Sequence, residues 1–295
     1  FTKSDAIKCN DINYVEAWIT NNTEKDIDEI NQLLCLASSG GHVRAVEKIL
    51  QVVGINVNVV SGDNDSTPLH QACQNGHTKV VKVLLAAKGI NVNQAEKYSG
   101  ITPLDMATSF GHPTIAKILI DAGANLDHAE EDGWTPLFIS VTRGYARCAQ
   151  LLIDAGASID KASTDHRHGG GFSPLAACCM QGNVSMVELL LQNGANGNHE
   201  TMQGCTPTSI AIWGQASDFM NISMSTFKQN PHINPKVYAQ IQHMLCNKGF
   251  TRKGRAPLGS KMCLFPTMMS GCADVGQTTP TFIGGENYEG SKEKP

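Results

Sequence analysis

Hydrophobic and polar positions along the chain alternate with a helical rhythm that glycine interrupts at regular intervals. Apolar residues recur every three or four positions in stretches such as 80–85 and 115–120, which is the spacing of one buried helix face. Stretches of small residues, such as 72–73 and 176–179, precede apolar stretches of this kind. Small side chains allow helices to stack closely, so the pattern predicts pairs of short helices separated by turns.

A short motif marks the start of the helices that are rich in small residues. Threonine or serine can cap the free amides of a helix, and proline suits the first turn, where its missing N–H costs nothing. Successive prolines of the motif lie 35, 33, 38 and 33 residues apart. The copies are Thr67-Pro68-Leu69-His70, Thr102-Pro103-Leu104-Asp105, Thr135-Pro136-Leu137-Phe138, Ser173-Pro174-Leu175-Ala176 and Thr206-Pro207-Thr208-Ser209.

A second motif follows each of the first four copies by about 20 residues, beginning with Gly89, Gly123, Gly156 and Gly194. Together the two motifs resemble the ankyrin repeat, a unit of about 33 residues with a Thr-Pro-Leu-His signature. The resemblance covers roughly residues 1–250 and implies an all-α solenoid of helix-turn-helix units with β-hairpin or turn tips. We count about seven units, of which residues 1–30 contain an N-terminal cap.

The chain departs from the family pattern in several places. The signature histidine is kept only at His70, so we expect the other joints between units to be less rigid. The tip at 163–171 is longer by five residues, and about 22 residues are inserted near 216–235 before a second helix resumes at 237–248. Insertions in repeat proteins fall in loops, often on the binding face. Residues 251–295 show no period and form an irregular, extended C-terminal tail that would order on the solenoid flank or on a partner.

In the ankyrin family, partner contacts concentrate at the tips before Thr-Pro and near the end of the first helix, on a concave face. Trp, Tyr and Arg are enriched at interface hot spots, and this chain has only 17 aromatic residues. Five of them fall at positions that we expect to be exposed, although single rings could instead fold against a neighbouring helix. The mapped partner-binding residues are Asp63, Asn64, Tyr98, Ser99, Phe110, Glu131, Asp132, Trp134, Arg143, Phe172, Met180, Gln181 and Trp213.

The sequence offers no catalytic centre and no cofactor motif. His166 and His168 lack two further ligands at zinc-binding spacing, and Cys178-Cys179 is not a Cys-x-x-Cys pair, so we expect neither a metal site nor a redox site. A net charge of −4 argues against nucleic acid as the partner, and no apolar run approaches the length of a membrane helix. We therefore expect a non-enzymatic chain that binds one or more proteins.

The ten cysteines lie mostly among small helix residues and lack the spacing of a disulfide framework. This usage favours a reducing intracellular compartment, most simply the cytoplasm. The chain begins at Phe1, so an organelle would also fit if a leader had been removed.

Two functions remain open from the sequence. The first is a protein-interaction module or scaffold that uses its concave face. The alternative is a structural subunit of a large hetero-complex, anchored by the insertion and the tail. A ubiquitin-ligase adaptor is disfavoured because residues 256–266 do not match the short helical box, rich in Leu and Cys, that often ends such adaptors.

Overall fold

The computed structural model describes residues 27–62, 65–164, 170–214 and 235–250, and the twelve helices in these ranges form six successive pairs. The first helices of the pairs are α3 (Ile27–Ser39), α5 (Pro68–Gln74), α7 (Pro103–Ser109), α9 (Pro136–Thr142), α11 (Pro174–Gln181) and α13 (Pro207–Gly214). The second helices are α4 (Val43–Ile49), α6 (Thr78–Leu85), α8 (Pro113–Asp121), α10 (Ala146–Asp154), α12 (Val184–Gln192) and α14 (Pro235–Asn247).

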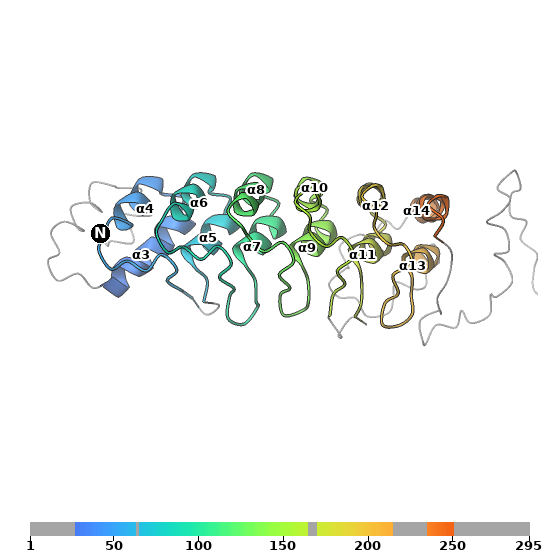
Figure 1. Ribbon diagram of the computed structural model, residues 1–295, viewed down its shortest axis with the longest axis horizontal. Helices are drawn as coiled ribbons and strands as arrows, with labels where there is room; N and C mark the ends of the chain where they lie inside the picture. Colours follow the sequence, from blue (N-terminus) through green and yellow to red (C-terminus); the bar gives the residue numbers. More distant parts are fainter. Residues whose placement is uncertain (1–26, 63–64, 165–169, 215–234, 251–295) are drawn as a thin grey trace, which may run out of the picture. The chain divides into compact units, whose positions relative to one another are not determined.

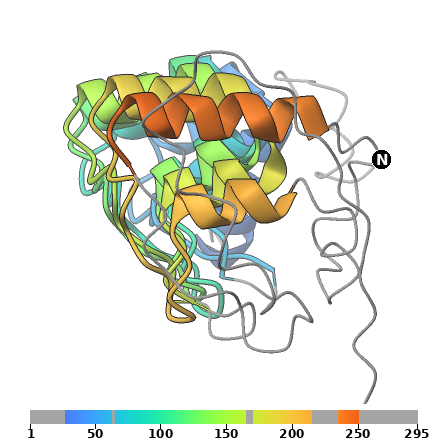
Figure 2. The same ribbon diagram turned by 90° about the vertical axis from the view of Figure 1, so that its right-hand side faces the viewer.

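The pairs stack side by side as a solenoid with two layers. First helices contact first helices of the neighbouring units, and second helices contact second helices, so each layer is a row of helices (Figure 1). Viewed along the stack, the loops that join one pair to the next all project from the side of the first helices (Figure 2). The all-α repeat architecture expected from the sequence is confirmed in this part of the chain.

The signature motif starts each helix as its chemistry predicts. Thr67, Thr102, Thr135 and Ser173 all adopt extended backbone conformations, and each is followed by proline in the first turn. Each side-chain oxygen accepts a hydrogen bond of 3.2–3.3 Å from the backbone N–H three residues later. Replacing such a cap by alanine typically costs about 1 kcal/mol, so the motif fixes where every unit begins.

A continuous hydrophobic core lies between the two rows. The small residues Ala72 and Cys73 of α5 are fully buried, which lets the rows approach closely. Leu84, Leu119 and Leu152 occupy corresponding places in successive second helices and are also fully buried. Burying one leucine side chain contributes about 1.5–3 kcal/mol, and the repeat multiplies this contribution along the stack.

The second motif links each unit to the next through a ladder of short polar side chains. The Oδ1 atom of Asn58 accepts a hydrogen bond from the backbone N–H of Asn91 at 2.8 Å, one unit further along. The same bond recurs from Asn125 to Asn93, from Ser158 to Asp127 and from Asn196 to Asp160, at 2.8–2.9 Å. The asparagine or aspartate at the end of the motif is therefore a connector between units.

The loops between pairs form five projecting turns, which we call fingers one to five: residues 61–66, 96–101, 130–134, 163–172 and 201–205. Each finger is closed by a backbone hydrogen bond to the carbonyl oxygen of the residue before the next cap, for example from Glu96 to Ile101 at 2.9 Å. Within the described ranges the one β-bridge joins Ser61 and Ser66, so the described parts of the fingers are turns and not regular strands.

Several sequence predictions fall outside the described residues. The cap lies there up to residue 26, as do the inserted segment near 216–235 up to residue 234 and the tail at 251–295. Helix α3 already begins at Ile27, and α14 begins at Pro235, two residues before the expected start of that helix.

Candidate partner-binding surface

Fingers two to four and the first helices beside them carry most of the residues mapped from the family pattern. We call this the finger surface. Tyr98, at the tip of finger two, is 62 % exposed, and the Lys97 ammonium lies 5.2 Å from the centre of its ring. Phe110, just after α7, is 46 % exposed. Both aromatic side chains are available to a partner, as expected from the sequence.

Finger three supplies an aromatic side chain, Trp134, which packs against a ring of the following helix. Trp134 is half-buried, and its ring centre lies 5.7 Å from that of Phe138 in a tilted arrangement. Phe138 occupies the signature position that holds His70 in an earlier unit. Trp134 therefore presents part of its ring from a fixed position and not from a mobile tip.

Charged groups surround Trp134. Glu131 and Arg143 are exposed, and Asp132 is partly exposed. Burial, together with the carboxyl groups of Asp105 and Asp132, raises the pKa of Glu130 to about 7, against the opposing effect of Arg143. The finger surface thus combines acidic groups, one arginine and aromatic rings, a mixture typical of protein interfaces.

Ser99 has a structural role within the fingers. Its hydroxyl donates to Glu96 Oε2 at 2.8 Å, and its carbonyl oxygen accepts from the backbone N–H of Glu131 at 3.1 Å. Ser99 therefore connects fingers two and three, whatever contact it makes with a partner.

Three mapped residues further along are less exposed than expected. Phe172 and Met180 are partly buried and pack against the hydrophobic core. Phe172 directly precedes the capping Ser173, at the base of finger four, where its ring rests on the helices. Gln181 donates from Nε2 to the carbonyl oxygen of Thr142 at 3.0 Å, which links α11 to α9. Phe172 and Trp134 are both partly buried, so the expectation of exposure holds only in part for these two rings.

Other mapped residues lie beyond what the structure describes. Asp63 and Asn64 belong to the undescribed part of finger one. Trp213 lies in α13, but its side chain is outside the described part of the molecule. Lys97, by contrast, was missed by the motif mapping, although a lysine adjacent to a tip tyrosine is a recognisable signal for a cation–π contact.

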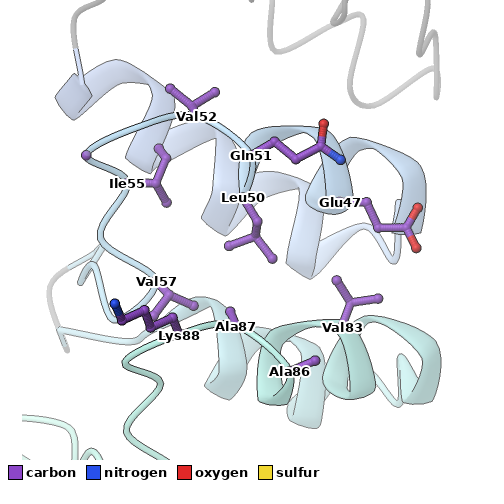
Figure 3. Close-up of a pocket in the computed structure, with 11 residues that line it drawn as sticks. Glu47, Leu50, Gln51, Val52, Ile55, Val57, Val83, Ala86, Ala87 and Lys88 are labelled. Atoms are coloured by element: carbon purple, nitrogen blue, oxygen red, sulfur yellow. The ribbon is translucent and has the colours of Figure 1, made fainter.

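A hollow of about 610 Å³ lies between α4 and α6, in the row of second helices. Leu50, at the end of α4, and Val83 of α6 point into the space between the two helices (Figure 3). The lining is mainly aliphatic, with Glu47 and Lys88 as its charged residues. The lining contains no serine, cysteine or histidine and no set of three metal ligands.

The described residues contain no group of three or more His, Cys, Asp or Glu side chains that could hold a metal ion. Burial raises the pKa values of the Cys178 and Cys179 thiols, and it raises that of Cys148 to about 11. A reactive cysteine needs a lowered pKa, so these thiols suit packing and not catalysis. None of the helices in the described ranges has the length and hydrophobicity required to span a bilayer.

Comparisons with known proteins agree with the repeat pattern. A family model described as ankyrin repeats in three copies matches residues 4–96 and 88–165, and a single ankyrin-repeat model matches residues 170–201. Together the matches span more than half of the 295 residues. None of the curated proteins matches the chain.

Proposed function

The chain belongs to the ankyrin-repeat family, whose members are generally protein-interaction modules, and from this we propose that it is a non-catalytic binding module or scaffold. Its partner would lie across the finger surface, with Trp134 at the centre. Repeat solenoids present extended surfaces of this kind in place of closed pockets.

One observation carries the location of the site: neighbouring units expose large aromatic side chains on the same surface. Tyr98 and Phe110, both in the unit of α7, are more than 40 % exposed, and the half-buried Trp134 belongs to the next unit. Exposed Glu131 and Arg143 add charges of both signs beside these rings. Val53 after α4 and Tyr145 before α10 are exposed outside the finger surface, but they belong to units that are not adjacent.

The test begins with co-purification from the native source and identification of the bound protein by mass spectrometry. Affinity for that protein is then measured with Trp134→Ala/Arg143→Ala and, separately, with Tyr98→Ala/Phe110→Ala. Each double variant should weaken binding about tenfold or more, because truncating one interface hot spot typically costs at least 2 kcal/mol.

Val53→Ser is the matched control, since Val53 is 92 % exposed and lies away from the fingers. It should leave the affinity unchanged. Unaltered binding by both double variants, with urea unfolding showing that they remain folded, would rule out the finger surface as the binding site.

The alternative function is a structural subunit of a hetero-complex, anchored by the insertion and the tail. It depends on residues 215–234 and 251–295, which lie outside the described ranges. A chain truncated after Phe250 distinguishes the two functions. An interaction module keeps its partner after this truncation, whereas an anchored subunit leaves its complex.

A reducing intracellular compartment fits this function. Cys35, Cys73, Cys148, Cys178 and Cys179 are all buried free thiols. We propose no cofactor, no nucleic acid and no membrane insertion as part of the binding activity.

A further inference from the structure

The fourth residue of the signature motif closes the joint between one unit and the next. In the unit that begins at Thr67, the Nδ1 atom of His70 accepts hydrogen bonds from the backbone N–H and the hydroxyl of Thr67, at 3.2 and 2.7 Å. Its Nε2–H donates to the carbonyl oxygen of Ile101 at 3.0 Å, at the base of finger two. That carbonyl also accepts the N–H of Glu96 that closes the finger.

Asp105 occupies the same position in the next unit, but with one contact missing. Its Oδ2 atom accepts from the backbone N–H and the hydroxyl of Thr102, at 2.9 and 2.6 Å, as Nδ1 does in His70. Its Oδ1 atom is buried and has no hydrogen-bond partner among the described residues, and the side chain is only 1 % exposed.

Trp134 is the counterpart of Ile101. It directly precedes the cap Thr135, and its carbonyl oxygen accepts the N–H of Glu130 that closes finger three, at 3.1 Å. The equivalence of the two units makes this carbonyl oxygen the acceptor that a donor on Asp105 Oδ1 would reach, as the Nε2–H of His70 reaches Ile101. An ionised Asp105 would therefore place a carboxylate oxygen against a carbonyl oxygen, two acceptors with no proton between them.

Burial and neighbouring charges both bear on this carboxyl group. Burial raises the pKa of Asp105 to about 6, against the hydrogen bonds from Thr102 and the charge of His128, which lower it. Finger three adds the carboxyl groups of Glu130 and Asp132, and α9 ends at the cationic Arg143. On α8, which also packs on α7, Lys117 and Asp121 pair with each other at 3.2 Å.

We propose that Asp105 takes up one proton from solvent in the folded protein and that its Oδ1–H donates to the carbonyl oxygen of Trp134. The protonated carboxyl then reproduces the bond that His70 makes one unit earlier, and Asp105 acts as a positioning residue for the base of finger three. The joint is closed at mildly acidic pH and weakened when the proton is lost.

The neighbouring joint at His70 responds to pH in the opposite direction. Burial lowers the pKa of His70, because the charged imidazolium is poorly solvated there. Protonating Nδ1 would also remove the acceptor for Thr67. Acidification therefore weakens the His70 joint and strengthens the Asp105 joint, so two successive units have opposite pH responses.

The direction in which Asp105 changes protein stability with pH follows from the difference between its pKa in the folded and unfolded states. Its folded pKa of about 6 lies above the ordinary value of 3.8, so its favourable contribution to stability is complete below about pH 4 and is lost as pH rises through about 6. Between about pH 5 and about pH 7.5, Asp105 alone should raise the apparent unfolding constant about tenfold.

The experiment is urea unfolding of the full chain at these two pH values, combined with a ¹³C-carboxyl NMR titration of the aspartates. Asp105→Asn keeps an oxygen for Thr102 and offers an N–H to Trp134 at every pH, so the tenfold contribution of Asp105 should disappear while that of Glu130 remains. Asp105→His should reverse the direction of this contribution to the pH dependence of unfolding. In the NMR titration, Asp105 of the unaltered protein should titrate near pH 6.

Glu130→Gln is the matched control, because it removes the neighbouring carboxylate and leaves Asp105 in place. In this variant the pKa of Asp105 should stay above its ordinary value of 3.8. The effect of Asp105 on the pH dependence of the unfolding constant should also remain. An Asp105 midpoint near 4, or a pH dependence that persists in Asp105→Asn and vanishes in Glu130→Gln, would overturn the proposal. No partner protein is needed, so the outcome is independent of the proposed binding function.

Discussion

The units built on α5–α8 and those built on α9–α12 differ in the kind of residue at the fourth position of the signature motif. In the first two, the signature position holds the polar residues His70 and Asp105, which complete a capping box with their threonines. In the other two, the same position holds the apolar residues Phe138 and Ala176. Phe138 has no polar side-chain atom to bond the next unit, and its ring packs against Trp134, the residue before its own cap.

The turns between paired helices differ in the same direction. The Nε2 atoms of His77 and His112 hydrogen-bond to carbonyl oxygens of the preceding unit, those of Ser39 and Gln74, at 2.8 and 3.0 Å. At the corresponding place in the third of these units, the ring of Tyr145 lies against Gly111. The rings of His77 and His112 lie against Gly41 and Gly76 in the same way, so the earlier turns combine ring packing with a hydrogen bond.

This comparison teaches that the backbone of the repeat tolerates either solution. Caps and the ladder of asparagine and aspartate side chains persist through both regions, so the units keep the same geometry. We expected units without the signature histidine to be less rigid at the joint, and this stays a prediction. Apolar packing can contribute as much stability as a polar contact, without a response to pH.

The largest expected effect is at the packed joint. Phe138→Ala should lower the free energy of unfolding by about 3–5 kcal/mol, because it leaves a cavity in a buried site and removes the support of Trp134. Urea unfolding measures the loss, and Phe138→Leu is the control that keeps most of the volume. A loss below about 1 kcal/mol would show that packing does not replace the hydrogen bond here.

At the polar joint, His70→Ala should cost about 2–4 kcal/mol, since it removes a fully buried side chain and leaves the Thr67 amide and the Ile101 carbonyl without His70. His70→Phe copies the residue of the later unit. If the two solutions are interchangeable, this variant recovers more than half of the loss at pH 7. A loss as large as in His70→Ala would mean that the joint is specific to its own neighbours.

The smallest expected effect concerns the turns. Gly111→Ala and Gly123→Ala both place a side chain on a residue with positive φ, 71° and 86°, which costs about 1–2 kcal/mol. A Cβ at Gly111 would also lie 2.6 Å from the Tyr145 ring, whereas one at Gly123 would meet nothing within 4 Å. Thermal unfolding should therefore show a loss about 1 kcal/mol larger for Gly111→Ala. Equal losses for the two variants would mean that the ring of Tyr145 moves aside without cost.

The sequence alone determined the architecture and much of the candidate site. Thr-Pro pairs at a nearly constant spacing predicted where the helices begin, because capping and the geometry of proline are local properties. The family pattern also predicted the exposed positions of Tyr98 and Phe110, which project from a tip and from a helix end. Repeated local signals make a solenoid readable, since each unit contacts only its neighbours.

Tertiary structure decided what the joints do. Phe172 packs against the hydrophobic core, and no spacing in the sequence shows this. The burial of His70 and Asp105, which shifts both pKa values, likewise comes from packing between units, and His70 bonds to Ile101 about 30 residues away. The composition of a motif sets which atoms can donate or accept a proton, but only packing between units sets which atoms meet and how much water is excluded.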